Sequence, residues 1–389
     1  MGKSRPPEKS KLNRKRKSVM NGNSKSPAQL LVEAVSTLQT SDPQGALQLA
    51  TAALRLLRNK PDKTEQLPAL SVLGEICIEL GDIPTAVSFF TQAAEIDPDG
   101  EVPEERGGGP EKFFWLAQLS DEGGRDSLKW YQRGANVLRK QIAALAAQEN
   151  SEQAEALLDE QRVKLASALC SVAEIWMTDL SWDDKEAEEQ CNKAMNEALS
   201  VAPDRPETLQ TVASVRISQS KLDEARVHLR NSLELWKDLD PEDPQIPDFP
   251  TRISLSRLLM EAEMEEEANE VLERLVAEDD ESVESWYLGG WCLYLIAQRH
   301  QEQATETMKD SEQADGDVQE LLRRSRKWLQ RCLRLCTTLD YEDERLQEHA
   351  KELVKELNDA LGDEGADTDS EDDYEDDESE NEDAEMEGT

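Results

Sequence analysis

Carboxylate and aromatic side chains recur along the chain in a combination that could bind a positively charged peptide. A carboxylate forms an ion pair with lysine or arginine, and the face of an aromatic ring attracts a guanidinium group. The candidate binding residues are Glu75, Glu79, Glu174, Glu261, Glu284, Tyr287 and Trp291. They can act together only if the fold brings them to one surface, so the elements that carry them must repeat regularly.

The residues able to act as nucleophiles, bases or metal ligands show no catalytic arrangement. The three histidines are His228, His300 and His349. They are far apart in the sequence, and no nucleophile motif surrounds them. Cys332 and Cys336 have the i, i+4 spacing of packed helix residues, and Gly107–Gly109 lacks the Lys-Ser/Thr that follows a phosphate loop and reads as a linker. We therefore expect no enzyme activity, no metal site and no cofactor.

A repeat of 34 residues provides the required regularity. Its clearest copy begins at Leu67 and has small residues at positions 8, 20 and 27, with a proline at position 32. The matching residues are Leu70, Leu73, Gly74, Cys77, Gly81, Ala86, Phe90, Ala93 and Pro98. Small residues let two antiparallel helices approach closely, and proline ends the second helix. The same register recurs from residues 27, 206, 249 and 283.

These spacings resemble the tetratricopeptide repeat and predict an all-α superhelical solenoid of about seven helix pairs over residues 29–361. Two pairs are irregular. The third has a short first helix around 113–119, and the fourth has an enlarged turn at 179–184. A polar insertion is expected at 300–317 in the seventh pair. An amphipathic helix over 344–361 is predicted to cap the open C-terminal end of the array.

In the tetratricopeptide fold the first helix of each pair lines an inner groove, and the candidate residues fall on these helices. Acidic residues outnumber basic ones there, with Arg257 the base in the sixth pair. An acidic groove with an aromatic cluster near its C-terminal end suits an extended basic segment. Two alternatives stay open: the glutamates are ordinary solvated residues, or Tyr287 and Trp291 pack on a neighbouring pair. A clamp for an acidic peptide is excluded, because Glu, Ser, Leu or Gln stand where it needs Lys, Arg and Asn.

The net charge of the whole chain also favours a basic partner. Its 389 residues include 84 Asp and Glu against 44 Lys and Arg, a net charge of −40. Nucleic acids and anionic membranes attract positive surfaces, so neither is the expected partner. The longest uncharged apolar run, 286–297, is too short to span a bilayer, and no signal peptide is expected. Six cysteines without C-x-x-C spacing fit a reducing compartment.

The two ends of the chain have opposite charge. Residues 1–28 contain nine basic residues and one acidic residue, whereas 362–389 contain sixteen acidic residues and no Lys or Arg. We expect both to be disordered, a basic head and an acidic tail, because neither can bury enough apolar surface to fold. A short cluster in the head is typical of nuclear import, with a solvated tail as the alternative. It consists of Lys11, Arg14, Lys15, Arg16 and Lys17.

The combination of basic head, interrupted repeats and acidic tail resembles the fungal family of dedicated assembly chaperones for the fourth large-subunit ribosomal protein. The resemblance implies that the solenoid captures the long internal loop of a basic ribosomal protein, prevents its aggregation and escorts it to nuclear pre-ribosomes. It implies residence in nucleus and cytoplasm and an import receptor as a second partner, without direct contact to nucleic acid or membrane. The alternatives are a histone-type chaperone on the same repeats and a scaffold without a basic client.

Overall fold

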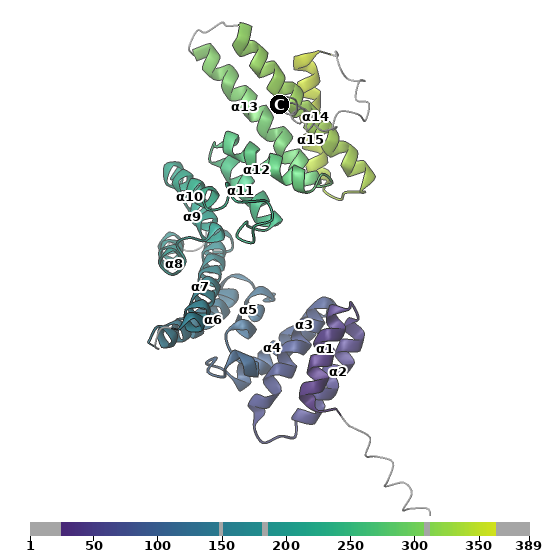
Figure 1. The fold of residues 1–389 in the computed structure, drawn as a ribbon, viewed down its shortest axis with the longest axis vertical. Coiled ribbons are helices and arrows are strands. Elements are labelled where there is room, and N and C mark those ends of the chain that lie inside the picture. Colours follow the sequence, from purple (N-terminus) through teal and green to yellow (C-terminus); the bar gives the residue numbers. More distant parts are fainter. Residues whose placement is uncertain (1–24, 148–150, 181–185, 307–311, 363–389) are drawn as a thin grey trace, which may run out of the picture. The chain divides into compact units, whose positions relative to one another are not determined.

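The computed structural model describes residues 25–147, 151–180, 186–306 and 312–362, and their regular structure is helical throughout (Figure 1). The helices are α1 (Pro27–Gln39), α2 (Pro43–Leu57), α3 (Leu67–Glu79), α4 (Ile83–Ile96), α5 (Glu111–Gln118), α6 (Gly124–Ala146), α7 (Glu152–Thr178), α8 (Ala187–Val201), α9 (Pro206–Ser218), α10 (Leu222–Glu234), α11 (Phe249–Glu261), α12 (Glu265–Glu278), α13 (Val283–Glu306), α14 (Glu312–Thr338) and α15 (Glu344–Leu361). Two short 3₁₀ turns, Lys63–Gln66 and Glu104–Arg106, precede α3 and α5.

The helices follow the predicted order of seven pairs and a cap, so the all-α class is confirmed. Contacts divide the chain into two compact units, one ending at Lys221 and the other beginning at Leu222. The first unit contains α1 to α9 and the second contains α10 to α15. The division falls between the helices of the fifth predicted pair. The head and tail lie almost wholly outside the described residues, and their disorder stays a prediction.

The turn between the two helices of a pair has a recurring left-handed residue. Ser41, Gly81, Ser220 and Glu263 all occupy position 15 of the repeat, with φ between 58° and 72°. A left-handed residue stops one helix and reverses the chain, and non-glycine residues adopt this conformation at some cost. Aspartates then cap the next helix in two of these turns, such as Asp82 accepting from the Thr85 amide at 3.3 Å. Backbone conformation thus supports the 34-residue register independently of the apolar pattern.

Position 8 of the repeat is small because the partner helix lies directly against it. At Gly74 in α3, an added Cβ would lie 2.4 Å from Cζ of the Phe90 ring in α4. The equivalent Gly290 in α13 faces Leu329 of α14, whose Cγ would lie 2.6 Å from such a Cβ. The hydroxyl of Ser325 donates to the Gly290 carbonyl oxygen at 2.7 Å across the same interface. Small residues therefore set the close approach of each pair.

One of the three expectations about irregular segments needs correction. Helices α13 and α14 extend through most of the expected 300–317 insertion, since α13 ends at Glu306 and α14 begins at Glu312. The segment is rich in Gln, Glu and Ala, which favour helix despite their polarity. Immediately before this segment, Arg299 of α13 donates a hydrogen bond to Glu265 in α12 at 2.8 Å, which stabilises the helix there. The enlarged turn at 179–184 lies mainly outside the described residues, whereas the short α5 in the third pair is confirmed.

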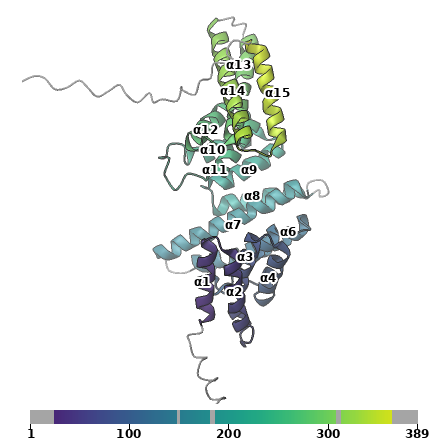
Figure 2. The ribbon, with the colours of Figure 1, turned by 90° about the vertical axis from the view of Figure 1, so that its right-hand side faces the viewer.

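The predicted capping helix is present over Glu344–Leu361. Helices α13, α14 and α15 lie side by side at the end of the second unit (Figure 2). The α15 helix buries Ala350, Leu353 and Leu357 against Leu329 of α14. Its opposite face is polar and exposed, as the outer surface of a solenoid cap must be.

Candidate peptide-binding surface

Three sets of neighbouring first helices contact one another within a unit. Helix α1 packs on α3 and α7 packs on α9 in the first unit, and α11 packs on α13 in the second. In the six pairs that lie within one unit, the first helix also packs against its own second helix, which covers another side. We use the term first-helix face for the exposed side of α3, α5 and α7 in one unit and of α11 and α13 in the other. The candidate binding residues lie on these helices.

Four of the predicted glutamates are exposed on the first-helix face and have no cationic partner within 4 Å among the described residues. They are Glu75, Glu79, Glu174 and Glu261. Glu75 and Glu79 lie one turn apart on α3, whereas Glu174 lies on α7 and Glu261 ends α11. These carboxylates are therefore available to an incoming lysine or arginine, and their role in binding stays a prediction.

Two of these glutamates lie in surroundings that disfavour their own charge. Burial raises the pKa of both Glu75 and Glu174, and the Glu111 carboxylate on α5 raises the pKa of Glu75 further. Both side chains still reach water, because neighbouring helices crowd the carboxylates without covering them. Each ionised group thus lacks full hydration and also lacks a counter-charge. A cationic side chain of a bound peptide would supply the counter-charge and compensate for the lost hydration.

Carboxylates elsewhere in the second unit are paired with the protein's own arginines. Arg299 of α13 contacts Glu265 of α12 at 2.8 Å, and Arg252 of α11 contacts Glu278 at 2.7 Å. Arg252 and Glu265 are each less than a tenth exposed. Buried charges need such partners, since an unpaired buried ion costs several kcal/mol. Many bases of this acidic chain are therefore engaged in holding helix pairs together.

Glu284 differs from the other predicted glutamates because it already has a partner. Its carboxylate on α13 forms an ion pair with Arg257 on α11. Arg257 is the base that the sequence places in the predicted groove, and this ion pair neutralises it. An incoming client would have to compete with Arg257 for Glu284, so this residue is a weaker candidate than the four unpaired glutamates.

Tyr287 and Trp291 are half-buried against the capping helix. The Tyr287 hydroxyl lies 2.7 Å from Nδ1 of His349 on α15, and the Trp291 ring packs edge-on against the His349 ring with centroids 5.2 Å apart. Tyr294, one turn further along α13, donates to Glu356 of α15 at 2.7 Å. These contacts favour the packing alternative, with the capping helix as the partner, and a role of Tyr287 and Trp291 in binding stays a prediction. Trp291→Ala would therefore disturb the cap as well as any bound peptide, so it is not a clean test of binding.

A further acidic group near α5 and α7 escaped the sequence reasoning. The Lys164 ammonium lies 3.1 Å from Glu160, 3.3 Å from Glu104 and 3.6 Å from Glu111. One lysine thus serves three carboxylates, and a net negative charge remains beside Glu75. The i, i+4 spacing of Glu160 and Lys164 was readable in the sequence. The approach of Glu104 and Glu111, about 60 residues away, depends on the tertiary fold.

The cysteines behave as packing residues. All six cysteines are buried and free, and burial raises the pKa of the Cys170 and Cys191 thiols to about 11, which disfavours the reactive thiolate. Among the described residues, no group of three or more His, Cys, Asp or Glu side chains could hold a metal ion. No helix in the described part of the chain is long and apolar enough to cross a membrane.

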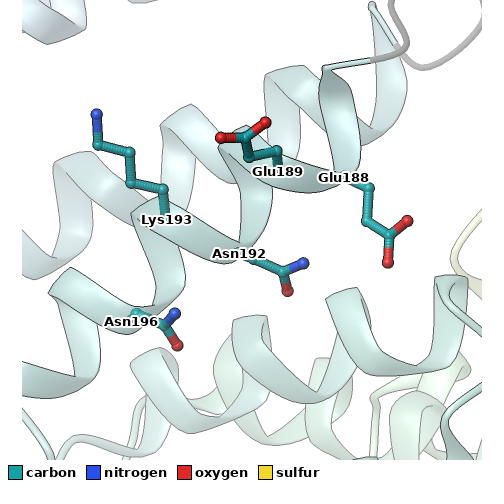
Figure 3. A pocket seen from close by; sticks show the side chains of 5 residues that line it. All are labelled: Glu188, Glu189, Asn192, Lys193 and Asn196. Carbon is teal, nitrogen blue, oxygen red and sulfur yellow. The ribbon is translucent and has the colours of Figure 1, made fainter.

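The side chains of a polar surface on α8 do not point towards one common ligand position. Figure 3 shows Glu189 and Lys193 pointing to one side of the helix and Glu188, Asn192 and Asn196 to the other. Asn192 is already occupied as an acceptor from Arg216 at 2.6 Å. The mixed charges and the open shape favour neither an acidic nor a basic ligand.

Comparison with known proteins places the chain in a family. A protein-family model described as the ACL4 C-terminal domain matches residues 281–381. A protein named probable assembly chaperone of rpl4 from Emericella nidulans is 44% identical over 358 residues, covering 90% of this chain and 88% of its own. Its namesake from Schizosaccharomyces pombe is 35% identical over 300 residues, covering 76% and 82%.

A solved structure described as the assembly chaperone of RpL4 (Acl4), residues 1–338, extends the likeness to the fold. It is 49% identical to this chain and has a TM-score of 0.66. The match covers 72% of this chain and 100% of the solved one. Chaperones of this kind are not enzymes, in accord with the expected lack of catalysis. The chain belongs to the family of fungal assembly chaperones of rpl4.

Proposed function

We propose that the chain is a dedicated chaperone in ribosome assembly that binds a basic, extended segment of RpL4 on its first-helix faces. The observation that supports this most directly is the set of unpaired glutamates, Glu75, Glu79, Glu174 and Glu261, in a chain whose other carboxylates often have internal partners. The relatives that bear the name of RpL4 chaperones support the identity of the client.

Capture begins with long-range attraction. The segment 29–362 carries a net charge of −32, which draws a basic chain towards the surface and speeds encounter. The client's lysines and arginines then pair with carboxylates that lack a counter-charge, and an extended chain can meet several of them in sequence. Affinity falls as salt rises, because exposed charges are screened over about 10 Å at 0.1 M salt.

Binding shields the client from other partners and precedes its transport to the nucleus. A basic segment held on an acidic surface cannot associate with nucleic acid or with other polyanions before assembly. The cluster Lys11–Lys17, which lies outside the described residues, would recruit an import receptor for transport to nuclear pre-ribosomes. On this proposal the protein is present in both cytoplasm and nucleus.

The identity of the client can be tested by affinity purification of the tagged full-length chain from growing cells. We expect a single ribosomal protein, RpL4, in stoichiometric amount by mass spectrometry, and a wash in high salt should remove it. Stoichiometric histones would instead identify a histone-type chaperone. Recovery of the chain without any basic protein would contradict the proposal.

Client binding should weaken when pH falls towards the raised pKa values of Glu75 and Glu174. A protonated carboxyl cannot pair with lysine, so the binding contribution is complete above the folded-state pKa and is lost as pH falls through it. We expect the Kd of a labelled basic peptide to rise about fivefold between about pH 7 and about pH 5, corresponding to about 1 kcal/mol. Fluorescence anisotropy at low salt measures this change.

The matched variant is Glu75→Gln with Glu174→Gln. Its Kd should already be raised at neutral pH and should vary less with pH than that of the parent. Its stability in urea should equal or slightly exceed that of the parent, because a raised folded-state pKa means that folding disfavours the ionised form at neutral pH. Identical pH profiles for parent and variant would show that these two glutamates do not bind the client.

A further inference from the structure

The C-terminal two thirds of α14 is strongly basic although the chain as a whole is acidic. Residues 321–338 contain six Lys and Arg and no Asp or Glu. Four of the six lie on one exposed side of the helix, because their spacings of four, four and three residues return to the same face. We call this the basic stripe; its residues are Arg323, Lys327, Arg331 and Arg334.

The basic stripe is only partly neutralised by neighbouring carboxylates. Arg323 contacts Glu320 at 3.4 Å with its side chain half exposed, and Arg331 reaches Asp280 only at 4.0 Å. Lys327 is exposed and has no ion pair among the described residues. The stripe extends over about 16 Å of helix at 1.5 Å per residue, and the unpaired Lys327 with the weakly paired Arg323 and Arg331 leaves positive charge along it.

A segment of opposite charge begins close to this stripe. Helix α15 packs along α14 and ends at Leu361, and near that end Asn358 accepts a hydrogen bond from Arg326 of α14 at 3.4 Å. The following residues, 363–389, contain sixteen carboxylates and no base. Twenty-seven extended residues reach up to about 90 Å, so the length of the tail does not prevent a return to α14.

We propose that the basic stripe of α14 is an intramolecular docking surface for the acidic tail, residues 363–389. The tail is linked to the same unit, so its carboxylates are present at high effective concentration near the stripe. Docking covers a cationic surface that would otherwise attract RNA, while the first-helix face stays acidic for its client. The contact is electrostatic and consists of many weak pairs, so it is reversible by salt.

The test uses the full-length chain with a dye attached through Ser379→Cys. The native cysteines are all buried, so a maleimide dye reacts at the new position. Dye anisotropy should be high in low salt and should fall in about 1 M NaCl, where screening acts within about 3 Å. The stripe variant Arg323→Gln, Lys327→Gln and Arg334→Gln should show the low value already in low salt.

A control with the same loss of charge is available on α6. Arg125→Gln, Lys129→Gln and Lys140→Gln also remove three positive charges from exposed residues, and dye anisotropy should stay at the parent value. Circular dichroism of each variant establishes that the helices are retained. Equal anisotropy in parent and stripe variant would overturn the proposal. So would stripe-dependent binding of a short RNA duplex with the dye unaffected, since the stripe would then be a nucleic-acid surface.

Discussion

Reversing Glu75, Glu174 and Glu261 together to lysine is expected to raise the Kd of the basic client segment about a hundredfold at low salt. Each residue stands on the first helix of a different pair, α3, α7 or α11, and has no cationic partner within 4 Å among the described residues. An exposed ion pair contributes up to about 1 kcal/mol, so three losses amount to about 3 kcal/mol or about a hundredfold. Titration of a fluorescent peptide with the sequence of a basic segment of RpL4 measures the change.

The control is a triple reversal on second helices. Glu95 of α4, Glu189 of α8 and Glu270 of α12 are also exposed glutamates without an ion pair among the described residues. Changing them to lysine alters the net charge equally but leaves the first-helix faces intact, so we expect only a small rise in Kd from weaker long-range attraction. An equal loss in both triples would mean that net charge alone governs binding.

The repeat register could be predicted from the sequence because it depends on local rules. Gly74 and Gly290 had to be small for the close approach of their partner helices, and the capping helix showed clear amphipathic spacing up to Leu361. Extension of α13 and α14 through the polar segment was missed, because polarity was read as a loop signal although the residues favour helix.

The sequence predicts which helix carries each candidate residue, but it does not predict which side chain that residue contacts. The repeat places Glu75, Glu174 and Glu284 on first helices, yet whether a carboxylate is free depends on bases brought from other helices, as Arg257 is to Glu284. The contacts of Tyr287 and Trp291 likewise depend on His349, about 60 residues away on the capping helix. Such contacts follow from tertiary packing, which the apolar pattern of one helix does not determine.

The largest effect on stability is expected at a residue that sequence reasoning passed over. Lys112 of α5 is almost fully buried, with its ammonium 2.8 Å from the Asp97 carboxylate and 2.6 Å from the Gly109 carbonyl oxygen. Burial lowers the pKa of Lys112, and the ion pair with Asp97 opposes that shift. Gly109 belongs to the glycine run expected to be a linker, and it adopts a φ of 80° here. The run is therefore part of a packed turn rather than a loose connection.

Lys112→Met is expected to reduce the free energy of unfolding by about 3–5 kcal/mol, the usual cost of leaving a buried charge without its partner. Asp97 would remain buried, and its Oδ1 would still accept from the Glu101 amide at 2.9 Å. Adding Asp97→Asn should restore part of the loss, because the amide removes the unpaired charge while its oxygen keeps that acceptor. Urea unfolding followed by circular dichroism measures all three proteins.

Lys140→Met on α6 serves as the control for Lys112→Met. Lys140 is exposed and has no ion pair among the described residues, so its replacement should change stability by about 0.5 kcal/mol or less. If Lys112→Met cost no more than Lys140→Met, the buried pair would not stabilise the junction between α4 and α5. A large loss that Asp97→Asn partly reverses would assign the stabilisation to charge pairing. A large loss that persists in the double variant would assign it to packing of the lysine stem against Phe113, whose ring lies 4.6 Å from the ammonium.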